Sequence, residues 1–515
     1  MTILNDDVFE HILRECSVSG LVNISLVSSH FHVSAMPHLL RTVSLDRNPE
    51  QIIGFLDFII NSSHKNIDNE ILGLGRYVLT FEVLMFACET SVKVWDDDDH
   101  YHLAAAEPEP YPISTWAPSL TKALALMPNL RSFVIEAEID DICLHSPDFV
   151  ATLLARPRLT DIDLWGIGPT ATTSFGQAMR LEEDTIRLRK VKYYIGDDIK
   201  QLALLKGEGF GSVLFASKEY LEELYFEAAD MHNLLIDEQR SRDSLNVART
   251  PVIFPKVVSI SLSNCDVHLD ALTQSFPSLR NLTFDFEPFL IGEKGVKNRI
   301  VSFSKLMSIK GSYKYISSFL QHTTCDNLLR LVIDSLWDSI TGEDVPAFLV
   351  TRAMPGLKSL HIVHSENSVV PWWKVLGQSL PSLNYLAISF ETEATCEPEN
   401  LCIHVPRLMK SVPLVYISIL FEGFLHTLGS RASPEVQAMV TEQAVAISYA
   451  RNIKSLKYID VCKTIDSVKG PKTWWKVIRP WSSCDENGVQ LEAIDEVEGM
   501  ALRDWHDHTI LDLQR

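Results

Sequence analysis

The sequence predicts an α/β protein, in which a short N-terminal segment of three helices precedes an irregular solenoid of strand–helix repeats. Three observations lead to this prediction. A strand phrase rich in leucine recurs along most of the chain, helical patterns separate its copies, and the first 45 residues carry three helical patterns of their own. At 515 residues the chain is also longer than one hydrophobic core usually supports, which favours a repeat array or several domains.

The recurring phrase is P-x-L-x-x-L-x-L/I/F, and its apolar residues alternate as in a strand with one buried face. Six copies carry the proline, at 127–135, 156–164, 254–262, 276–284, 354–362 and 380–388. Other copies keep the spacing without it, at 219–226, 303–309, 326–333 and 412–419, and in the triplets Leu40-Val43-Leu45 and Val78-Phe81-Val83. Helical patterns lie between copies, for example at 52–60, 114–126, 372–380 and 434–450. This alternation is typical of the leucine-rich repeat, with parallel strands on the concave face and helices on the convex face.

The first 45 residues contain signals for three short helices. Asn5 is a good N-cap for the first helix, Ser17 or Ser19 for the second, and Ser28 or Ser29 for the third. Apolar residues fall on more than one face of these helices, and a core of about forty residues is too small to be stable alone. The pattern therefore predicts either a binding partner or packing against the rest of the chain.

Three stretches of this segment share their spacing with a known family: Leu4-x-x-x-Val8-x-x-x-Ile12-Leu13, the run from Gly20 to Phe31, and Leu40-x-x-Val43-x-Leu45. They resemble the F-box family, whose leucine-rich second helix is followed by V-C/S-R/K-x-F/W, as in LVNISLVSSHF here. Asn5 stands where the family usually has proline. The resemblance implies that the segment binds a Skp-type adaptor and, through it, the cullin of an SCF ubiquitin ligase. The residues to which it assigns adaptor contact are Leu4, Val8, Ile12, Leu13, Leu21, Ile24, Val27 and Phe31. The alternative is that these residues form a helical cap on the solenoid.

Composition and charge exclude several classes of protein. The formal net charge of −21, without clustered Lys and Arg, argues against a nucleic-acid partner. No apolar run reaches the 18 or so residues of a membrane helix, and acidic residues stand where a signal peptide needs positive charge. Nine scattered cysteines without CxxC spacing indicate neither a disulfide framework nor a zinc site. We therefore expect a cytoplasmic or nuclear protein with no membrane contact.

Motifs of catalysis and of metal or cofactor binding are weak. The glycines at 207–211 lack the ending of a phosphate-binding loop, and no nucleophile elbow, HExxH or kinase-like set is present. His506-x-His508, with Asp504 and Asp507 beside it, offers some metal ligands, but we expect a solvated loop there. The sequence therefore predicts no enzyme and no cofactor. An enzyme with its site in the loop 84–125 is the alternative, and it would need convergent His or carboxylate groups.

The predicted organisation has three parts. Residues 1–45 form the F-box-like helical domain, residues 46–465 the leucine-rich-repeat-like solenoid with long loops near 84–125 and 165–220, and residues 466–515 a C-terminal cap or tail. The tail contains Trp474, Trp475, Trp481 and Trp505, too many aromatic residues for a free linker. We expect it to cover the apolar end of the last repeat, and a partner-binding surface is the alternative.

These observations predict the substrate-recognition subunit of an SCF-type ubiquitin ligase, and a repeat scaffold without a ubiquitin role is the alternative. The substrate is expected to contact outward strand positions of the concave face. They are Asp161, Asp163, Trp165, Glu223, Tyr225, Glu227, Asn281, Thr283, Asp285, Arg330, Asp334, His361 and Tyr385. The acidic residues among the earlier positions suggest a basic protein substrate or degron, and an evenly solvated face is the alternative.

Overall fold

The computed structural model divides the chain into two compact units, Met1–Ser278 (unit 1) and Leu279–Arg515 (unit 2). Each unit is described by itself. The described residues are 6–46, 49–65, 71–84, 112–182, 186–195, 202–203, 209–230, 251–286, 289–291, 300–334, 354–365, 379–391, 404–422, 441–465, 468–469, 472–479 and 488–512. None of the helices within these ranges has both the length and the hydropathy that a bilayer crossing needs.

Unit 1 begins with three short helices, α1 (Asp6–Glu15), α2 (Val18–Ser25) and α3 (Ser29–Leu39). The side chains of Ser17 and Ser28 cap α2 and α3 by accepting hydrogen bonds from backbone N–H groups in the first turn. Leu13, Leu21 and Ala35 fill the space between the helices and are almost fully buried. Such a core is small, because each helix is only two or three turns long.

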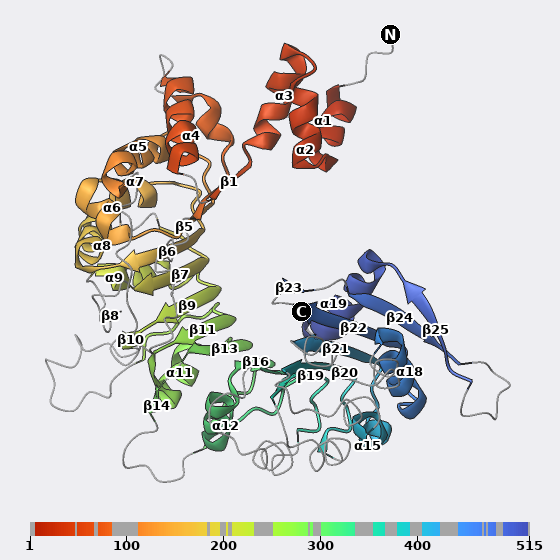
Figure 1. Ribbon diagram of the computed structural model, residues 1–515. Helices are drawn as coiled ribbons and strands as arrows, with labels where there is room; N and C mark the ends of the chain where they lie inside the picture. The colour runs from red at the N-terminus through yellow and green to blue at the C-terminus, as the bar shows by residue number, and fades with distance from the viewer. Residues whose placement is uncertain are drawn as a thin grey trace, which may run out of the picture. The chain divides into compact units, whose positions relative to one another are not determined.

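The sheet of unit 1 is parallel throughout, with the strand order β1-β4-β5-β6-β7-β9-β11. The strands are β1 (Thr42–Asp46), β4 (Thr80–Leu84), β5 (Ser132–Ile135), β6 (Asp161–Ile167), β7 (Lys190–Ile195), β9 (Glu223–Glu227) and β11 (Ser259–Ser263). The helices after α3 are α4 (Pro49–Ser62), α5 (Ile113–Ala125), α6 (Ile139–His145), α7 (Phe149–Leu154), α8 (Pro169–Glu182), α9 (Gly209–Ser217) and α11 (Leu269–Ser275). Figure 1 shows α4 to α9 along one face of the sheet.

The sheet of unit 2 is mostly parallel, in the order β13-β16-β18-β19-β20-β21-β22, and is extended by antiparallel β24 and β25. Its strands are β13 (Asn281–Phe286), β16 (Ser308–Gly311), β18 (Arg330–Ile333), β19 (Ser359–Ser365), β20 (Tyr385–Glu391), β21 (Tyr416–Glu422), β22 (Tyr458–Ile465), β24 (Thr473–Ile478) and β25 (Gln490–Ile494). The helices within its described residues are α12 (Tyr313–His322), α15 (Val405–Leu408), α18 (Glu442–Asn452) and α19 (Glu496–Asp512).

The described residues of both units also contain short elements. In unit 1 they are β2 (His64–Lys65), β3 (Ile71–Leu72), the 3-10 helix η1 (Leu74–Tyr77), β8 (Leu202–Ala203), β10 (Ala229–Asp230) and β12 (Asp266–His268). In unit 2 they are β14 (Phe289–Ile291), β15 (Val301–Ser302), β17 (Thr323–Thr324), the 3-10 helix η4 (Met409–Ser411) and β23 (Val468–Lys469).

The recurring sequence phrase forms a turn followed by a strand. In the copy at 354–362, the Leu357 N–H donates to the carbonyl of Met354 at 3.0 Å, so that the proline occupies the second position of the turn, where its fixed φ is favourable. Leu357, Leu360 and Ile362 are then buried. The carbonyl before most of the parallel strands accepts two N–H groups from the next repeat. For example, the Lys358 carbonyl accepts from Asn384 and Tyr385 at 2.9 and 3.0 Å. These bonds fix the register of neighbouring strands.

The prediction of an α/β chain built on parallel strands is confirmed, and all twelve copies of the phrase lead into strands of the two sheets. The prediction of a long loop over 165–220 is wrong, because this span holds α8, β7 and α9 and therefore another strand–helix unit. β7 was missed because its triplet, Leu188-Val191-Tyr193, ends in tyrosine rather than in Leu, Ile or Phe, and because its outward positions are Lys190 and Lys192. In the other predicted loop, residues 85–111 lie outside the described residues and α5 follows them.

Along the strands of the two sheets, side chains generally alternate between the core under the helices and the opposite face, which we call the front face. In β6, for example, Ile162 and Leu164 are buried, whereas Asp161 and Asp163 lie half-buried on the front face. In unit 2 the C-terminal helix α19 lies on part of this face, where it contacts β21 and β24. The front faces of the two units therefore present different surfaces.

Candidate functional site

The three N-terminal helices carry many exposed apolar side chains. Leu26 and Val27 directly follow α2, and their side chains are 78% and 68% exposed. We call the exposed set the N-terminal apolar surface, and it consists of Val8, Ile12, Val18, Val22, Leu26, Val27 and Val33. Exposed apolar groups concentrated on so short a segment indicate an interaction site, because each of them gains free energy when it leaves water.

The predicted adaptor contacts divide into three groups. Val8, Ile12 and Val27 are exposed, and Ile24 and Phe31 are half-buried. Leu13 and Leu21 instead pack inside the segment, and Leu4 lies outside the described residues. Phe31 also holds α3 against α1, because its ring lies 5.1 Å from that of Phe9, centroid to centroid. The exposed group can contact a partner directly, whereas the buried group positions the helices.

The front face of unit 1 carries alternating charges in register. Asp161, Lys190 and Glu223 are aligned across β6, β7 and β9, and Lys190 Nζ lies 2.9 Å from Glu223 Oε1. In the next row, Lys192 Nζ lies 3.5 Å from Asp163 Oδ2. The sequence reasoning missed these lysines because it placed their strand in a loop. Lys190 and Lys192 partly neutralise the acidic face that the sequence predicted.

Burial affects the two carboxyl groups of β6. It raises the pKa of Asp163, and the nearby Lys192 reduces this rise only in part. The pKa of Asp161 is raised by the same cause, and Thr160 and Lys190 oppose it. A positive charge brought to this face would therefore stabilise both carboxylates.

The predicted substrate contacts from Asn281 onward belong to unit 2. On β13, Asn281 and Thr283 are half-buried and Asp285 is exposed. Asp334 follows β18, and burial raises the pKa of its carboxyl, while Lys310 at 3.7 Å opposes this shift. The other three, Arg330, His361 and Tyr385, lie where α19 packs on the front face.

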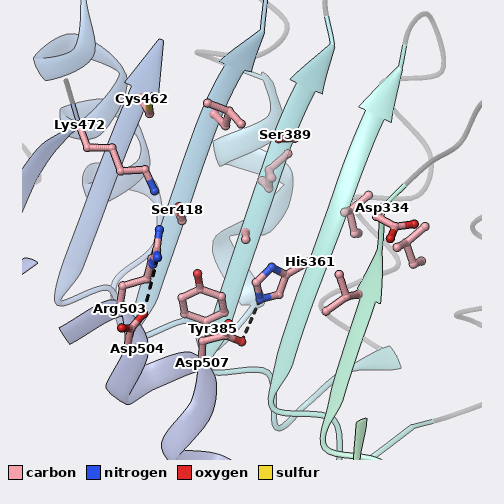
Figure 2. Close-up of a pocket in the computed structure, with 16 residues that line it drawn as sticks. Asp334, His361, Tyr385, Ser389, Ser418, Cys462, Lys472, Arg503, Asp504 and Asp507 are labelled. Carbon is pink, nitrogen blue, oxygen red and sulfur yellow. Dashed lines mark hydrogen bonds and ion pairs between the residues drawn. The ribbon is translucent and has the colours of Figure 1, made fainter. Parts of the chain in front are cut away.

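A carboxylate on α19 connects that helix to the sheet. Asp507 accepts hydrogen bonds from Arg330 Nε and Nη2 at 2.8 and 3.0 Å, from Ser359 Oγ at 2.9 Å and from His361 Nε2 at 2.9 Å. Burial alone would raise the pKa of Asp507, but His361 and Arg330 hold it well below its usual range. Four charge-assisted or neutral donors on one carboxylate fix the position of the helix. Figure 2 shows His361 and Asp507 facing each other across the gap between strand and helix.

An aromatic cluster next to this carboxylate forms a second, smaller core. Tyr385, Tyr416 and Trp474 are buried there, with Tyr458, Ile494 and Leu502 packed against them. Gly499 permits the close approach of α19, because a Cβ at this position would collide with the Trp474 ring. Of the other tail tryptophans, Trp475 is buried, Trp505 is exposed and Trp481 lies outside the described residues.

The expectation of a solvated loop at His506-x-His508 is wrong, because both residues belong to α19. The His506 ring lies 5.6 Å from that of Tyr416 and 5.7 Å from that of Tyr458, centroid to centroid, so it packs in the second core. Within the described ranges, no group of three His, Cys, Asp or Glu side chains is arranged to hold a metal ion. The side chains of this motif that are described thus serve packing and helix attachment.

A cavity of about 430 Å³ lies between α19 and the sheet (Figure 2). Its floor includes the small side chains of Ala387, Ser389, Ser418 and Cys462, and Lys472 and Arg503 reach it from the side. Lys472 Nζ lies 3.1 Å from Oδ1 of the fully buried Asp460. The Arg503–Asp504 pair is longer, at 3.6 Å. The cavity has the size of a small-ligand site, but its charges largely pair with each other.

The stability of unit 2 is expected to depend on pH through His506. Burial lowers the pKa of His506, and Lys457 lowers it further. Since the folded protein then binds fewer protons than the unfolded chain, stability falls as the pH drops below the unfolded value of 6.5. Replacing His506 with Phe keeps a ring in the second core, so the variant should lose less stability between about pH 7.5 and about pH 5.5. Thermal unfolding at both pH values measures this, and equal losses in the two proteins would contradict it.

Comparisons with known proteins place few limits on the chain. No family model matches it, and no curated protein matches it. Among solved structures, it is similar to a chain of the "Crystal structure of Rad7 and Elc1 complex in yeast", with a TM-score of 0.32 and 14% sequence identity. The alignment covers 59% of this chain and 73% of that one. So distant a likeness assigns no function.

Proposed function

We propose that this protein is the substrate-recognition subunit of an SCF-type ubiquitin ligase. In this proposal the N-terminal apolar surface binds a Skp-type adaptor, which connects the chain to a cullin, and the leucine-rich-repeat-like units bind a protein substrate. The single observation that carries it is the N-terminal apolar surface. Five of its seven residues, Val8, Ile12, Val22, Leu26 and Val27, lie within the stretches whose spacing resembles the F-box.

The energetics favour a partner for this surface. Burial of apolar area is worth roughly 25 cal/mol per Å², so each large side chain that a partner covers contributes on the order of 1 kcal/mol or more. Val18, Leu26 and Val33 are each more than two-thirds exposed. A scaffold whose helices merely cap the first repeat would cover these side chains itself. Their exposure therefore favours the receptor over the scaffold alternative.

The proposed receptor has no catalytic residue. It acts by holding a substrate near the ubiquitin-conjugating enzyme of the assembled ligase, which turns an encounter between two molecules into a nearly intramolecular one. The proposal needs two separate surfaces, one for the adaptor and one for the substrate. The N-terminal helices and the front face of unit 1 supply them.

Co-purification of the full chain with a Skp-type adaptor tests the proposal. Leu26→Asp and Val27→Asp place a charge on the N-terminal apolar surface, and each is expected to weaken capture at least about tenfold, because a buried unpaired carboxylate opposes binding. Leu21 is unsuitable for this test because it is buried, and Leu21→Asp would disturb the helices themselves.

Leu144→Asp on α6 is the matched control, since Leu144 is also an exposed apolar residue, at 62%. It should capture the adaptor as the unmodified chain does. If the folded, unmodified chain fails to capture the adaptor, or if all three variants capture it equally, the proposal is wrong.

A further inference from the structure

Three aromatic rings form a row on the front face of unit 1. Trp165 on β6 stacks on Tyr194 of β7 with a centroid distance of 3.9 Å and an interplanar angle of 27°. Tyr194 in turn lies 4.6 Å from Tyr225 of β9. Trp165 is 38% exposed and both tyrosines are half-buried. We call these three residues the aromatic row.

An irregularity in β6 positions Trp165. The register with β7 shifts between Leu164 and Ile167, so that β6 contains one extra residue, as in a β-bulge. Gly166 has a φ of +65°, which favours glycine, and a Cβ there would collide with Glu138. A bulge changes the direction of the adjacent side chain, and here that side chain is Trp165. Regular pairing would not need this glycine.

Acidic side chains share the front face with the aromatic row. The alternating front-face positions of β4, β6, β7 and β9 carry five carboxylates against two ammonium groups. The carboxylates are Glu82, Asp161, Asp163, Glu223 and Glu227, and the ammonium groups are Lys190 and Lys192. The excess of negative charge is complementary to a cationic partner, and the exposed face of an indole attracts a cation directly.

We propose that the aromatic row is a recognition site for arginine side chains in a basic segment of a partner protein. The guanidinium group would lie on the exposed face of Trp165, and neighbouring basic residues would meet the carboxylates. Arginine fits better than lysine because its planar group stacks on aromatic rings and loses less hydration. The inference rests on the proposed function only in identifying this segment as part of the substrate.

The test uses the full chain and three fluorescent peptides of equal length that alternate glycine with arginine, lysine or glutamate. Fluorescence anisotropy should show that the arginine peptide binds about two- to fivefold tighter than the lysine peptide for each stacked guanidinium, and that the glutamate peptide does not bind. Trp165→Ala should remove this preference and leave the weaker, charge-dependent binding. Trp505→Ala is the control, because Trp505 is an exposed tryptophan of unit 2 and should leave the preference unchanged.

Equal affinity for the arginine and lysine peptides would overturn the inference, as would an arginine preference that survives Trp165→Ala. Unchanged thermal unfolding of Trp165→Ala would show that its fold is intact. Trp165→Phe keeps an aromatic face and should therefore retain part of the arginine preference. Adaptor capture measured on the same preparations separates this result from the proposed function. Leu26→Asp should lose the adaptor and keep the arginine preference, whereas Trp165→Ala should do the reverse.

Discussion

Replacing Asp507 with alanine is expected to detach α19 from the front face of unit 2 and to destabilise that unit by about 3–5 kcal/mol, the usual cost of removing one partner of a buried ion pair. Asp507 is only 5% exposed and accepts hydrogen bonds from three side chains. Without it, the Arg330 guanidinium would remain largely buried and unpaired, which accounts for most of the cost. A loss of this size corresponds to a fall in Tm of roughly 10 °C.

Asp504→Ala provides the comparison, because Asp504 lies one turn earlier on the same helix and its side chain is 60% exposed. Its pairing with Arg503 should contribute less than about 1 kcal/mol. Hydrogen exchange of the α19 amides distinguishes the two variants. Fast exchange should appear in Asp507→Ala alone, and slow exchange in both variants would show that the aromatic core holds the helix without this carboxylate.

The same carboxylate has a defined pH dependence. The pKa of Asp507 is lowered in the folded state. Its contribution to the free energy of unfolding is therefore complete above the unfolded pKa near 3.8 and is lost as the pH falls from there toward the folded pKa. His506 acts in a higher pH range, because its contribution to stability begins to fall once the pH drops below about 6.5. Acid should therefore weaken the second core before it weakens the Asp507 attachment.

The position of α19 also bears on how a substrate could bind. Arg330, His361 and Tyr385 were predicted to face a substrate, yet Asp507 and the second core engage them within unit 2. The front-face positions of β6 and β9 have no such helix on them among the described contacts. A substrate that used the unit 2 positions would have to displace α19, whereas one that used the aromatic row would not. The proposed binding surface therefore centres on unit 1.

The strands could be predicted from sequence because their signal is local. Each needs only an apolar triplet with L-x-x-L-x-L spacing, and the proline strengthens it by fixing the preceding turn. β7 and β22 were missed although they keep the triplets, Leu188-Val191-Tyr193 and Leu456-Ile459-Val461. A search that accepted any large apolar residue at the last place of the triplet would have found both.

The candidate sites were harder to predict because their residues are distant in the sequence. Asp507 is separated from Arg330 by 177 positions, and no local pattern indicates that a tail carboxylate meets that strand. Similarly, the sequence alone could not show that Lys192 lies opposite Asp163, because this depends on strand register. What the sequence did contain was an unexplained cluster of His and Asp at 504–508. Such a cluster near the end of a repeat array can indicate packing as well as metal binding.

Lys472→Met is expected to destabilise unit 2 by about 3–5 kcal/mol, because it leaves a fully buried carboxylate without its cation. Among the described residues, Asp460 would keep two neutral donors, the Tyr416 hydroxyl at 2.9 Å and Ser418 Oγ at 2.8 Å. These hydrogen bonds stabilise the carboxylate but cannot neutralise it. Lys476→Met is the control, since Lys476 is half exposed and lies 4.0 Å from Glu492, and it should cost less than about 1 kcal/mol.

Combining Lys472→Met with Asp460→Asn separates the cost of an unpaired charge from the loss of packing. Asparagine carries no charge, and its amide oxygen can accept a hydrogen bond from one of the Tyr416 and Ser418 hydroxyls while its N–H group donates to the other. The double variant should therefore regain most of the stability that Lys472→Met loses. Urea unfolding of the two single variants and the double variant measures this coupling. If the effects of the two substitutions simply add, the charge of Asp460 is tolerated without Lys472. Lys472 would then stabilise the tail through its aliphatic chain and through its ammonium group, which lies 5.2 Å from the centroid of the Trp474 ring.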